Sequence, residues 1–128
     1  MSLAYLRKYD DMLYLATPFS KYAPGLDYAC DQACIIAGRM LRAGLYPFSP
    51  IAHSFTIAKV SGIDPLDHAF WLDQCRVQQK KCAALIICEL PGWHESEGIK
   101  AELAQAMLLK QPIYYLNPDN MTVRVATP

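Results

Sequence analysis

Residues 83–90 read Ala-Ala-Leu-Ile-Ile-Cys-Glu-Leu, an almost continuously apolar stretch in a chain of 128 residues. A strand that is covered on both faces of a parallel sheet has this composition, because all of its alternating side chains lie in the core. Three shorter runs rich in strand-forming residues accompany it, at residues 12–16, 45–49 and 112–116. Residues 121–128 are expected to add an edge strand or a loose tail.

Between these runs, apolar side chains recur at helical spacing. The segments with this pattern are residues 26–42, 64–81 and 99–107. Gly44 suits the position just after the first helix, and Asp64 followed by Pro65 is typical of the start of the second. Residues 50–62, in contrast, are expected to form a long connecting loop, a kind of segment that often binds ligands.

The predicted elements alternate strand and helix along the chain. Parallel strands joined in this way have right-handed crossovers, which place helices on both faces of the sheet. The sequence therefore predicts an α/β fold, a Rossmann-like three-layer sandwich around a central parallel sheet of four or five strands. The length suits a single domain, residues 1–128, and leaves no room for two independent cores.

Composition argues against several classes of function. Lys and Arg number 12, Asp and Glu number 12, and the sequence pI is about 6.8, so no net field attracts a nucleic acid polymer or an anionic lipid surface. No apolar run approaches the roughly 20 residues that cross a bilayer, and residues 1–11 lack the pattern of a secretion signal. We expect a cytoplasmic protein without a membrane partner.

The five cysteines include no Cys-x-x-Cys pair and lie mostly in apolar segments, so they are interpreted as buried thiols. They are Cys30, Cys34, Cys75, Cys82 and Cys88. His53, His68 and His94 lack the spacing of metal ligands and are expected at the surface or at an interface. Neither a metal nor a cofactor is expected.

Ligands of open parallel sheets bind beyond the carboxyl ends of the strands, near the point where the strand order reverses. The segments that should meet there are residues 16–20, 49–53 and 91–98. Ser96 occupies an N-cap position, and a helix start carries unpaired amides, so a phosphate can rest against Ser96 and the amides of Glu97 and Gly98. Simple capping of the helix by Ser96 is the alternative interpretation.

Glu102 lies in the second turn of the same predicted helix, at the margin of its apolar face. One interpretation is a solvated edge residue. The other is a carboxylate at the mouth of a cleft, kept ionised by the positive end of its own helix. Such a group would be a nucleophile for an electron-poor carbon.

Four stretches together resemble the nucleoside 2-deoxyribosyltransferase-like proteins. They are Tyr14-Leu-Ala-Thr-Pro-Phe19 in the first strand, Ser96-Glu-Gly-Ile-Lys-Ala-Glu-Leu-Ala-Gln-Ala106, the Pro91-Gly-Trp93 segment before it, and Phe70-Trp71. The last two are similar to a small bacterial and phage branch of that superfamily. The resemblance implies a flavodoxin-like fold, N-glycosidic bond chemistry on a small nucleoside or nucleotide, and a homo-oligomer whose sites borrow side chains from a neighbour.

By this resemblance, Glu102 matches the family nucleophile, which attacks the anomeric carbon to give a covalent glycosyl-enzyme. Ser96 matches the residue that contacts the 5'-phosphate in the related 2'-deoxynucleoside 5'-monophosphate N-hydrolases, where nucleoside-specific members have Asp. The resemblance therefore implies a substrate with a 5'-phosphate, which a Ser can bind and an Asp would repel. The remaining residues it places at the base and sugar are Thr17, Pro18 and Phe19, with Tyr14 and Tyr22 as further candidates.

Two aromatic segments have open interpretations. Trp93 and His94, in the loop before the last helix, can close over a bound base or form a subunit contact. Phe70 and Trp71 are expected in the core or at an interface rather than at the substrate.

One position departs from the family pattern. Cys75 stands where the family places an Asp that binds and protonates the leaving base. Asp73 is the nearest carboxylate, but a shift of two residues turns a helical side chain by about 200°. A protonated thiol is a poor general acid, so this role is weakened, moved to Asp67 or His53, or lost.

Three functions follow as hypotheses. The first is cleavage or transfer of the N-glycosidic bond of a (deoxy)nucleoside 5'-monophosphate through a glycosyl-Glu102 intermediate, with Asp73 as the second carboxylate. Retaining chemistry of this kind places two carboxyl groups roughly 5 Å apart. The second is a nucleotide-binding or sensing module without catalysis. The third is hydrolysis of a dinucleotide such as NAD, which the short loops disfavour.

Overall fold

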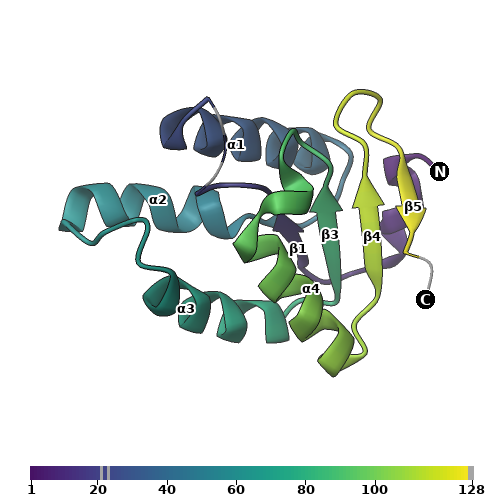
Figure 1. The fold of residues 1–128 in the computed structure, drawn as a ribbon. Coiled ribbons are helices and arrows are strands. Elements are labelled where there is room, and N and C mark those ends of the chain that lie inside the picture. The colour runs from purple at the N-terminus through teal and green to yellow at the C-terminus, as the bar shows by residue number, and fades with distance from the viewer. Residues whose placement is uncertain (21, 23, 127–128) are drawn as a thin grey trace.

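The central sheet has five strands in the order β2-β1-β3-β4-β5, of which β1, β3, β4 and β5 are labelled in Figure 1. Their bounds are Leu13–Ala16 for β1, Pro47–Phe48 for β2, Ala84–Cys88 for β3, Ile113–Leu116 for β4 and Val123–Val125 for β5. The computed structural model describes residues 1–20, 22 and 24–126. β1 to β4 are parallel, as predicted, and β5 is an antiparallel edge strand on β4. The last two residues of the predicted edge segment lie outside the described residues.

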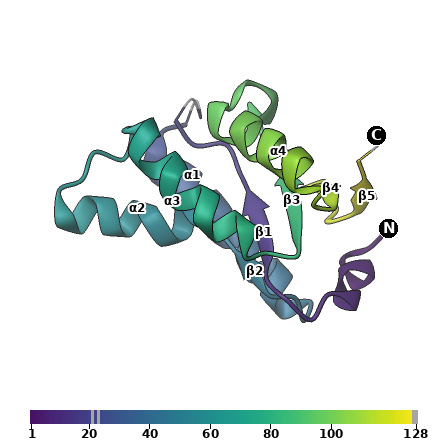
Figure 2. The same ribbon diagram turned by 90° about the horizontal axis from the view of Figure 1, so that it is seen from below.

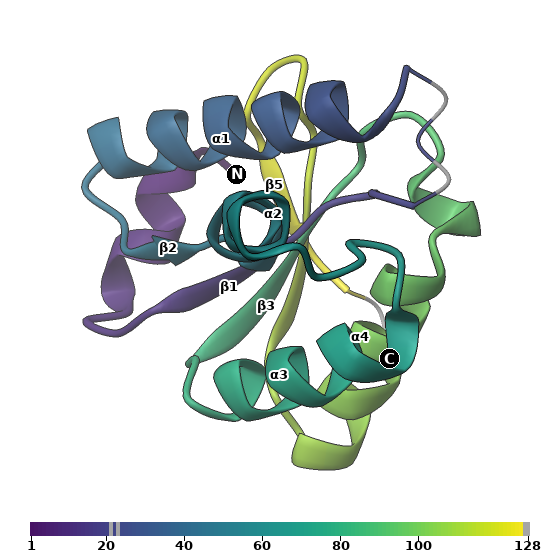
Figure 3. The same ribbon diagram turned by 90° about the vertical axis from the view of Figure 1, so that its left-hand side faces the viewer.

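Helices cover both faces of the sheet, which makes the fold a three-layer α/β sandwich (Figure 3). The helices are α1 (Leu26–Arg42), α2 (Pro50–Ser61), α3 (His68–Lys80) and α4 (Glu97–Leu109), with short 3-10 helices η1 (Leu3–Lys8) and η2 (Trp93–Glu95). α1 and η1 pack on one face. α3 and α4 lie side by side on the other (Figure 2). α2 contacts α1 and β1.

The two core layers meet at β1. Leu13 and Leu15 belong to the cluster under α1, whereas Tyr14 and Ala16 belong to the cluster under α4. All four side chains are buried, because successive residues of a strand point to opposite faces of the sheet. β3 is likewise buried at every position, which explains the apolar run that predicted it.

Residues 50–61 form α2, where the sequence analysis expects a loop, so that expectation is wrong. Ser49 caps the helix start by accepting a hydrogen bond from a first-turn amide at 3.1 Å, and Gly62 ends it with φ 75°. These are ordinary start and stop signals. The helical period is blurred because apolar side chains lie on opposite faces: Phe55 is buried, whereas Val60 is 84% exposed.

The start of α3 differs from the prediction by three residues. Asp67, not Asp64, is the N-cap residue, and its carboxylate accepts from the Phe70 amide at 3.4 Å. Asp64 closes a separate turn by accepting from the Leu66 amide at 2.9 Å. The helix therefore begins at His68, and it ends at Lys80 as predicted.

Two expectations from composition can be compared with the fold. Cys30, Cys82 and Cys88 are buried, Cys75 is half-buried, and Cys34 is exposed, contrary to the expectation of buried thiols. All five are free of disulfides. Within residues 1–20, 22 and 24–126, the structure contains no helix with the length and apolar character that a membrane span needs.

The strand order reverses between β1 and β3. The chain passes from β1 outward to β2 on one side and then returns to place β3 on the other side. The connections that leave β1 and β3 run in opposite directions, towards β2 and β4, and they separate at the carboxyl ends of these strands, which leaves room there for a ligand. α4 begins beyond the same end of β3, at Glu97.

Candidate functional site

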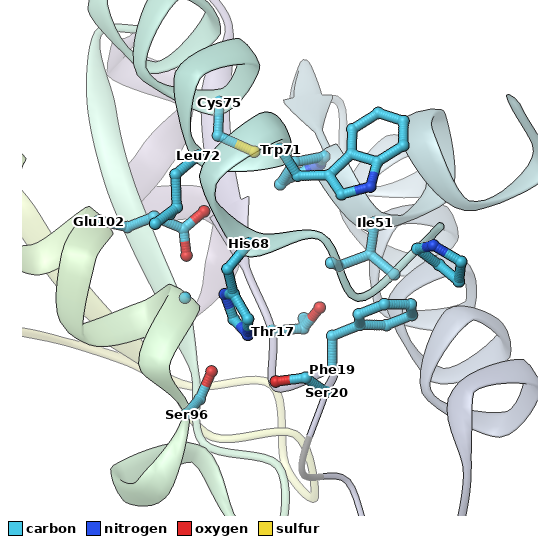
Figure 4. A pocket seen from close by; sticks show the side chains of 13 residues that line it. Thr17, Phe19, Ser20, Ile51, His68, Trp71, Leu72, Cys75, Ser96 and Glu102 are labelled. Atoms are coloured by element: carbon cyan, nitrogen blue, oxygen red, sulfur yellow. The ribbon is translucent and has the colours of Figure 1, made fainter. Parts of the chain in front are cut away.

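A cleft opens beyond the carboxyl end of β1, between α3 and the first turns of α4 (Figure 4). Its main lobe has about 560 Å³ of space, part of it open to solvent. The lining residues are Thr17, Phe19, Ser20, Pro50, Ile51, Pro65, His68, Trp71, Leu72, Cys75, Ser96, Gly98 and Glu102. All three segments predicted to converge contribute to this lining.

The start of α4 forms one end of the main lobe. Ser96 is 5% exposed and is the N-cap residue, as predicted, with its Oγ accepting from the Ile99 amide at 3.2 Å. Gly98 lines the lobe one residue into the helix. First-turn amides and the helix dipole place positive potential at this end, which suits an anion.

Glu102 faces the cleft, not the solvent. Its side chain lines the main lobe and the residue is 7% exposed. Burial raises the pKa of its carboxyl from 4.5 to about 8, and the nearby Tyr14 hydroxyl only partly opposes this. The carboxyl therefore keeps its proton near neutral pH, contrary to the expectation that Glu102 is ionised, and burial is the main cause.

Tyr14 and Cys75 surround Glu102 from two other elements. The Tyr14 hydroxyl comes from β1, is fully buried, and has no hydrogen-bond partner among the described residues. Burial, followed by the charge of Glu102, raises the pKa of Tyr14. Burial also raises the pKa of the Cys75 thiol, on α3, to about 11. All three groups therefore hold their protons through most of the neutral pH range.

Thr17 supplies a second unsatisfied hydroxyl. It follows β1 directly, is 4% exposed, and its Oγ1 has no hydrogen-bond partner in the described part of the chain. Buried hydroxyls are normally hydrogen-bonded, so one that lines a cleft is available to a ligand. Phe19 and Ser20 continue the same wall, whereas Pro18 is buried and does not line the cleft.

α3 forms the opposite wall with four side chains. His68, Trp71, Leu72 and Cys75 follow the i, i+3, i+4, i+7 spacing of one helix face (Figure 4). The Trp71 indole Nε1 donates to the Asp64 carbonyl oxygen at 2.9 Å, which fixes the ring. His68 is exposed, as a surface residue was expected to be, and it also lines the cleft, whereas Trp71 is half-buried at the cleft and not in the core. Their common spacing is the signal that would have found them.

A smaller lobe adjoins the main one at Trp71 and has about 340 Å³ of space, part of it open to solvent. We call it the apolar lobe; its lining residues are Phe19, Pro50, Ile51, Ser54, Phe55, Ala58, Pro65, Trp71 and Cys75. Apart from the Trp71 Nε1–H, which donates to the Asp64 carbonyl oxygen, its polar side-chain groups are the Cys75 thiol and the Ser54 hydroxyl. The Ser54 hydroxyl lacks a hydrogen-bond partner among the described residues. The cleft thus joins a helix N-terminus, a buried carboxyl group and an apolar recess.

Besides Pro18, further residues predicted at the site do not line it. Asp73 is exposed and forms an ion pair with Arg76 at 3.0 Å, so the two-residue shift does turn it away. His53 is exposed, with its ring 5.6 Å from that of Phe48. The other two pack elsewhere: Trp93 against Tyr115 and Tyr22 against Tyr28.

Metal ligation has little basis in the described residues. Those residues contain no group of three or more His, Cys, Asp or Glu side chains suited to hold a metal ion. Of the residues that line the main lobe, those with a His, Cys, Asp or Glu side chain are Glu102, Cys75 and His68.

The fold and the cleft define the class of this protein: an α/β domain with an open, mostly parallel sheet and a cleft at the switch point. Residues 11–117 match the model of the family described as "Domain of unknown function (DUF1937)". Because the match spans most of the chain, the protein belongs to this family. No curated protein matches the chain.

Proposed function

We propose that this protein cleaves or transfers the N-glycosidic bond of a (deoxy)nucleoside 5'-monophosphate, with Glu102 as the nucleophile. The observation that carries the proposal is the buried Glu102 carboxyl, which lines the cleft between the α4 N-terminus and an apolar recess. A nucleotide has the same order of groups: phosphate, sugar and flat base. The resemblance of residues 14–19 and 96–106 to nucleoside 2-deoxyribosyltransferase-like proteins supports it further.

The 5'-phosphate belongs at the start of α4. Ser96 and Gly98 line this end, and Ser20 and His68 face it from the other side of the cleft (Figure 4). The serine hydroxyls and first-turn amides donate to phosphate oxygens, and a ring N–H of His68 adds a further hydrogen bond. Asp67, the alternative acid of the sequence analysis, is occupied as the cap of α3.

The chemistry follows from the place of Glu102. Its carboxylate oxygen bonds to the anomeric carbon as the C1'–N bond breaks, and the bonding electron pair leaves with the base. Water then cleaves the glycosyl ester to complete hydrolysis, or a second base completes transfer. With a pKa of about 8, about one tenth of Glu102 is ionised at pH 7, so activity rises with pH up to that value.

A homo-oligomer is part of the proposal. Gln79 is the only buried residue of α3, and several large apolar side chains on α2, α3 and α4 are exposed. They are Ile57, Val60, Phe70, Val77, Met107, Leu108 and Leu109, and Leu66, between α2 and α3, is exposed as well. A second copy packed on these helices would cover them. The five free cysteines suit a reducing, cytoplasmic location.

A nucleotide-binding module without catalysis is the second candidate. Cys75 in place of an acid favours it, because a thiol with a pKa of about 11 protonates a leaving base poorly. The two candidates make different predictions for turnover but not for binding.

The test incubates the protein with ribo- and deoxyribonucleoside 5'-monophosphates and the matching nucleosides, and follows free base by chromatography. We expect release from the monophosphates, little from the nucleosides, and none with Glu102→Gln. Glu95→Gln, an exposed carboxylate outside the cleft lining, is the matched control and should keep full activity. Thermal shifts with nucleotides but no base release would favour the binding module.

A further inference from the structure

The apolar lobe has no strong proton donor. Among its described lining residues, none is Asp, Glu, His, Lys or Arg, and the available protons are those of Ser54 and Cys75. The lobe lies next to Glu102, since Cys75, Trp71 and Phe19 line both lobes. On the proposed function, this is where the base sits when the C1'–N bond breaks.

A neutral purine or pyrimidine leaves as an anion unless it is protonated. A general acid for such a step needs a pKa near the working pH. A serine hydroxyl is a far weaker acid, and burial raises the pKa of the Cys75 thiol to about 11. Asp73 turns outward to Arg76, and Asp67 caps α3, so neither carboxylate supplies the proton.

We propose that the preferred substrate is a 5'-phosphorylated N-glycoside whose base is already positively charged at the glycosidic nitrogen, as in a pyridinium mononucleotide. The proposal rests on the proposed function and names its leaving group. The apolar lobe is aromatic and uncharged, and it lies beside a single carboxyl group. This environment suits a positively charged base, but it offers no proton to help a neutral base leave.

The aromatic walls of the apolar lobe favour the binding of a flat cation. The Phe19 and Phe55 rings meet edge to face with centroids 5.4 Å apart, and the indole of Trp71 is fixed by its bond to Asp64. Aromatic faces attract cations, indole most strongly. Lys59 lies over the Phe55 ring at 5.2 Å, but it is ion-paired with Asp27 and does not line the recess.

A cationic substrate also prepares the nucleophile. The titratable side chains that face Glu102 are Tyr14 from β1 and Cys75 and His68 from α3. None of these three is an anion, so Glu102 is the group whose negative charge a bound cation stabilises. A positive charge placed near Glu102 favours its carboxylate form. Such a substrate therefore promotes loss of the Glu102 proton, which a neutral nucleotide does not.

The reaction balances without an acid. The Glu102 carboxylate oxygen forms a bond to C1' while the C1'–N bond breaks, and its electron pair neutralises the ring nitrogen, so the base departs uncharged. Water then attacks the ester, giving the sugar 5'-phosphate, the Glu102 carboxylate and one proton released to solvent.

The experiment compares kcat/KM for β-nicotinamide mononucleotide with that for AMP, dAMP and CMP, at one pH and with the same preparation. We expect nicotinamide release to be at least tenfold faster than release of any neutral base, and to be lost in Glu102→Gln. The variant Cys75→Asp places a carboxylate in the recess. Because general acids contribute roughly 10²- to 10⁴-fold, it should raise cleavage of the neutral nucleotides at least tenfold.

The matched control for this variant is Gln74→Asp, which adds a carboxylate to the exposed side of the same helix and should change neither rate. Wild-type cleavage of neutral nucleotides at a rate equal to or above that of the pyridinium substrate overturns this inference but leaves the proposed function in place, provided that it depends on Glu102. Absence of cleavage with every substrate overturns both.

Discussion

Replacement of Glu102 by Gln is expected to stabilise the fold, and to do so more strongly as the pH rises. Glu102 has a pKa of about 8 in the folded chain against an ordinary 4.5. Between these values the unfolded chain has lost the proton that the folded chain keeps, so wild-type stability falls as the pH rises through this window. Below pH 4.5 both states are protonated, and above pH 8 the loss is complete.

The magnitude follows from linkage. One pH unit corresponds to about 1.4 kcal/mol, so between pH 4.5 and pH 7 the wild type loses about 3 kcal/mol that a glutamine at this position keeps. This is a large share of the roughly 5–15 kcal/mol by which domains are stable. A residue retained at such a disadvantage is typical of a functional site.

The assay is urea unfolding of the wild type and Glu102→Gln at pH 4.5, 6, 7 and 8. Glu95→Gln serves as the exposed control, and its curve should run parallel to the wild type. The informative quantity is how the difference between Glu102→Gln and wild type changes with pH, since the other ionisable side chains are common to both. If that difference stays constant from pH 4.5 to 8, the argument about buried Glu102 is refuted, whatever its absolute size.

Further substitutions test the N-cap of α4 at Ser96 and the hydrogen bonds that Gln79 makes between α3 and α4. Ser96→Ala removes the capping hydrogen bond and should lower the free energy of unfolding by about 1 kcal/mol. It should also reduce the increase in melting temperature that AMP causes. Ser96→Asp keeps a capping side chain but should lose the AMP shift through repulsion, while stability stays near wild type; a retained AMP shift would contradict the phosphate assignment. Gln79→Ala removes the buried bonds from Gln79 to the Glu102 carbonyl at 2.8 Å and to the Gln111 side chain at 3.2 Å. It should lower the unfolding free energy by about 2–3 kcal/mol, and a loss below 0.5 kcal/mol in urea unfolding would show that α3 and α4 are held mainly by other contacts.

Most of the fold was predictable because its signals are local. β1 and β3 are marked by continuous apolar residues, and α4 by its cap at Ser96, and each depends on a few neighbouring positions. α2 was missed although Ser49 and Gly62 mark its ends, because apolar residues on both of its faces hide the helical period. The signal that failed was therefore the helical period of apolar residues, which depends on a whole segment and not on a few neighbouring positions.

The cleft was predictable only in part. Convergence of three segments followed from the parallel sheet, and so did the place of Ser96 and Thr17. The contributions of His68 and Trp71 depend on how α3 is rotated against α4, and that rotation is set by distant contacts such as the Gln79 bonds. Sequence spacing says which residues share a helix face but not what that face meets.

The sequence by itself determined the alternation of strands and helices, the parallel sheet and the position of Glu102 in the second turn after β3, since these depend on residue order and short-range preference. Whether Glu102 faces solvent or a cleft, and whether it is ionised there, was decided by the tertiary structure. Hydration of a carboxyl group depends on every element packed around it, and here β1 brings Tyr14 and α3 brings Cys75 against it from far along the chain.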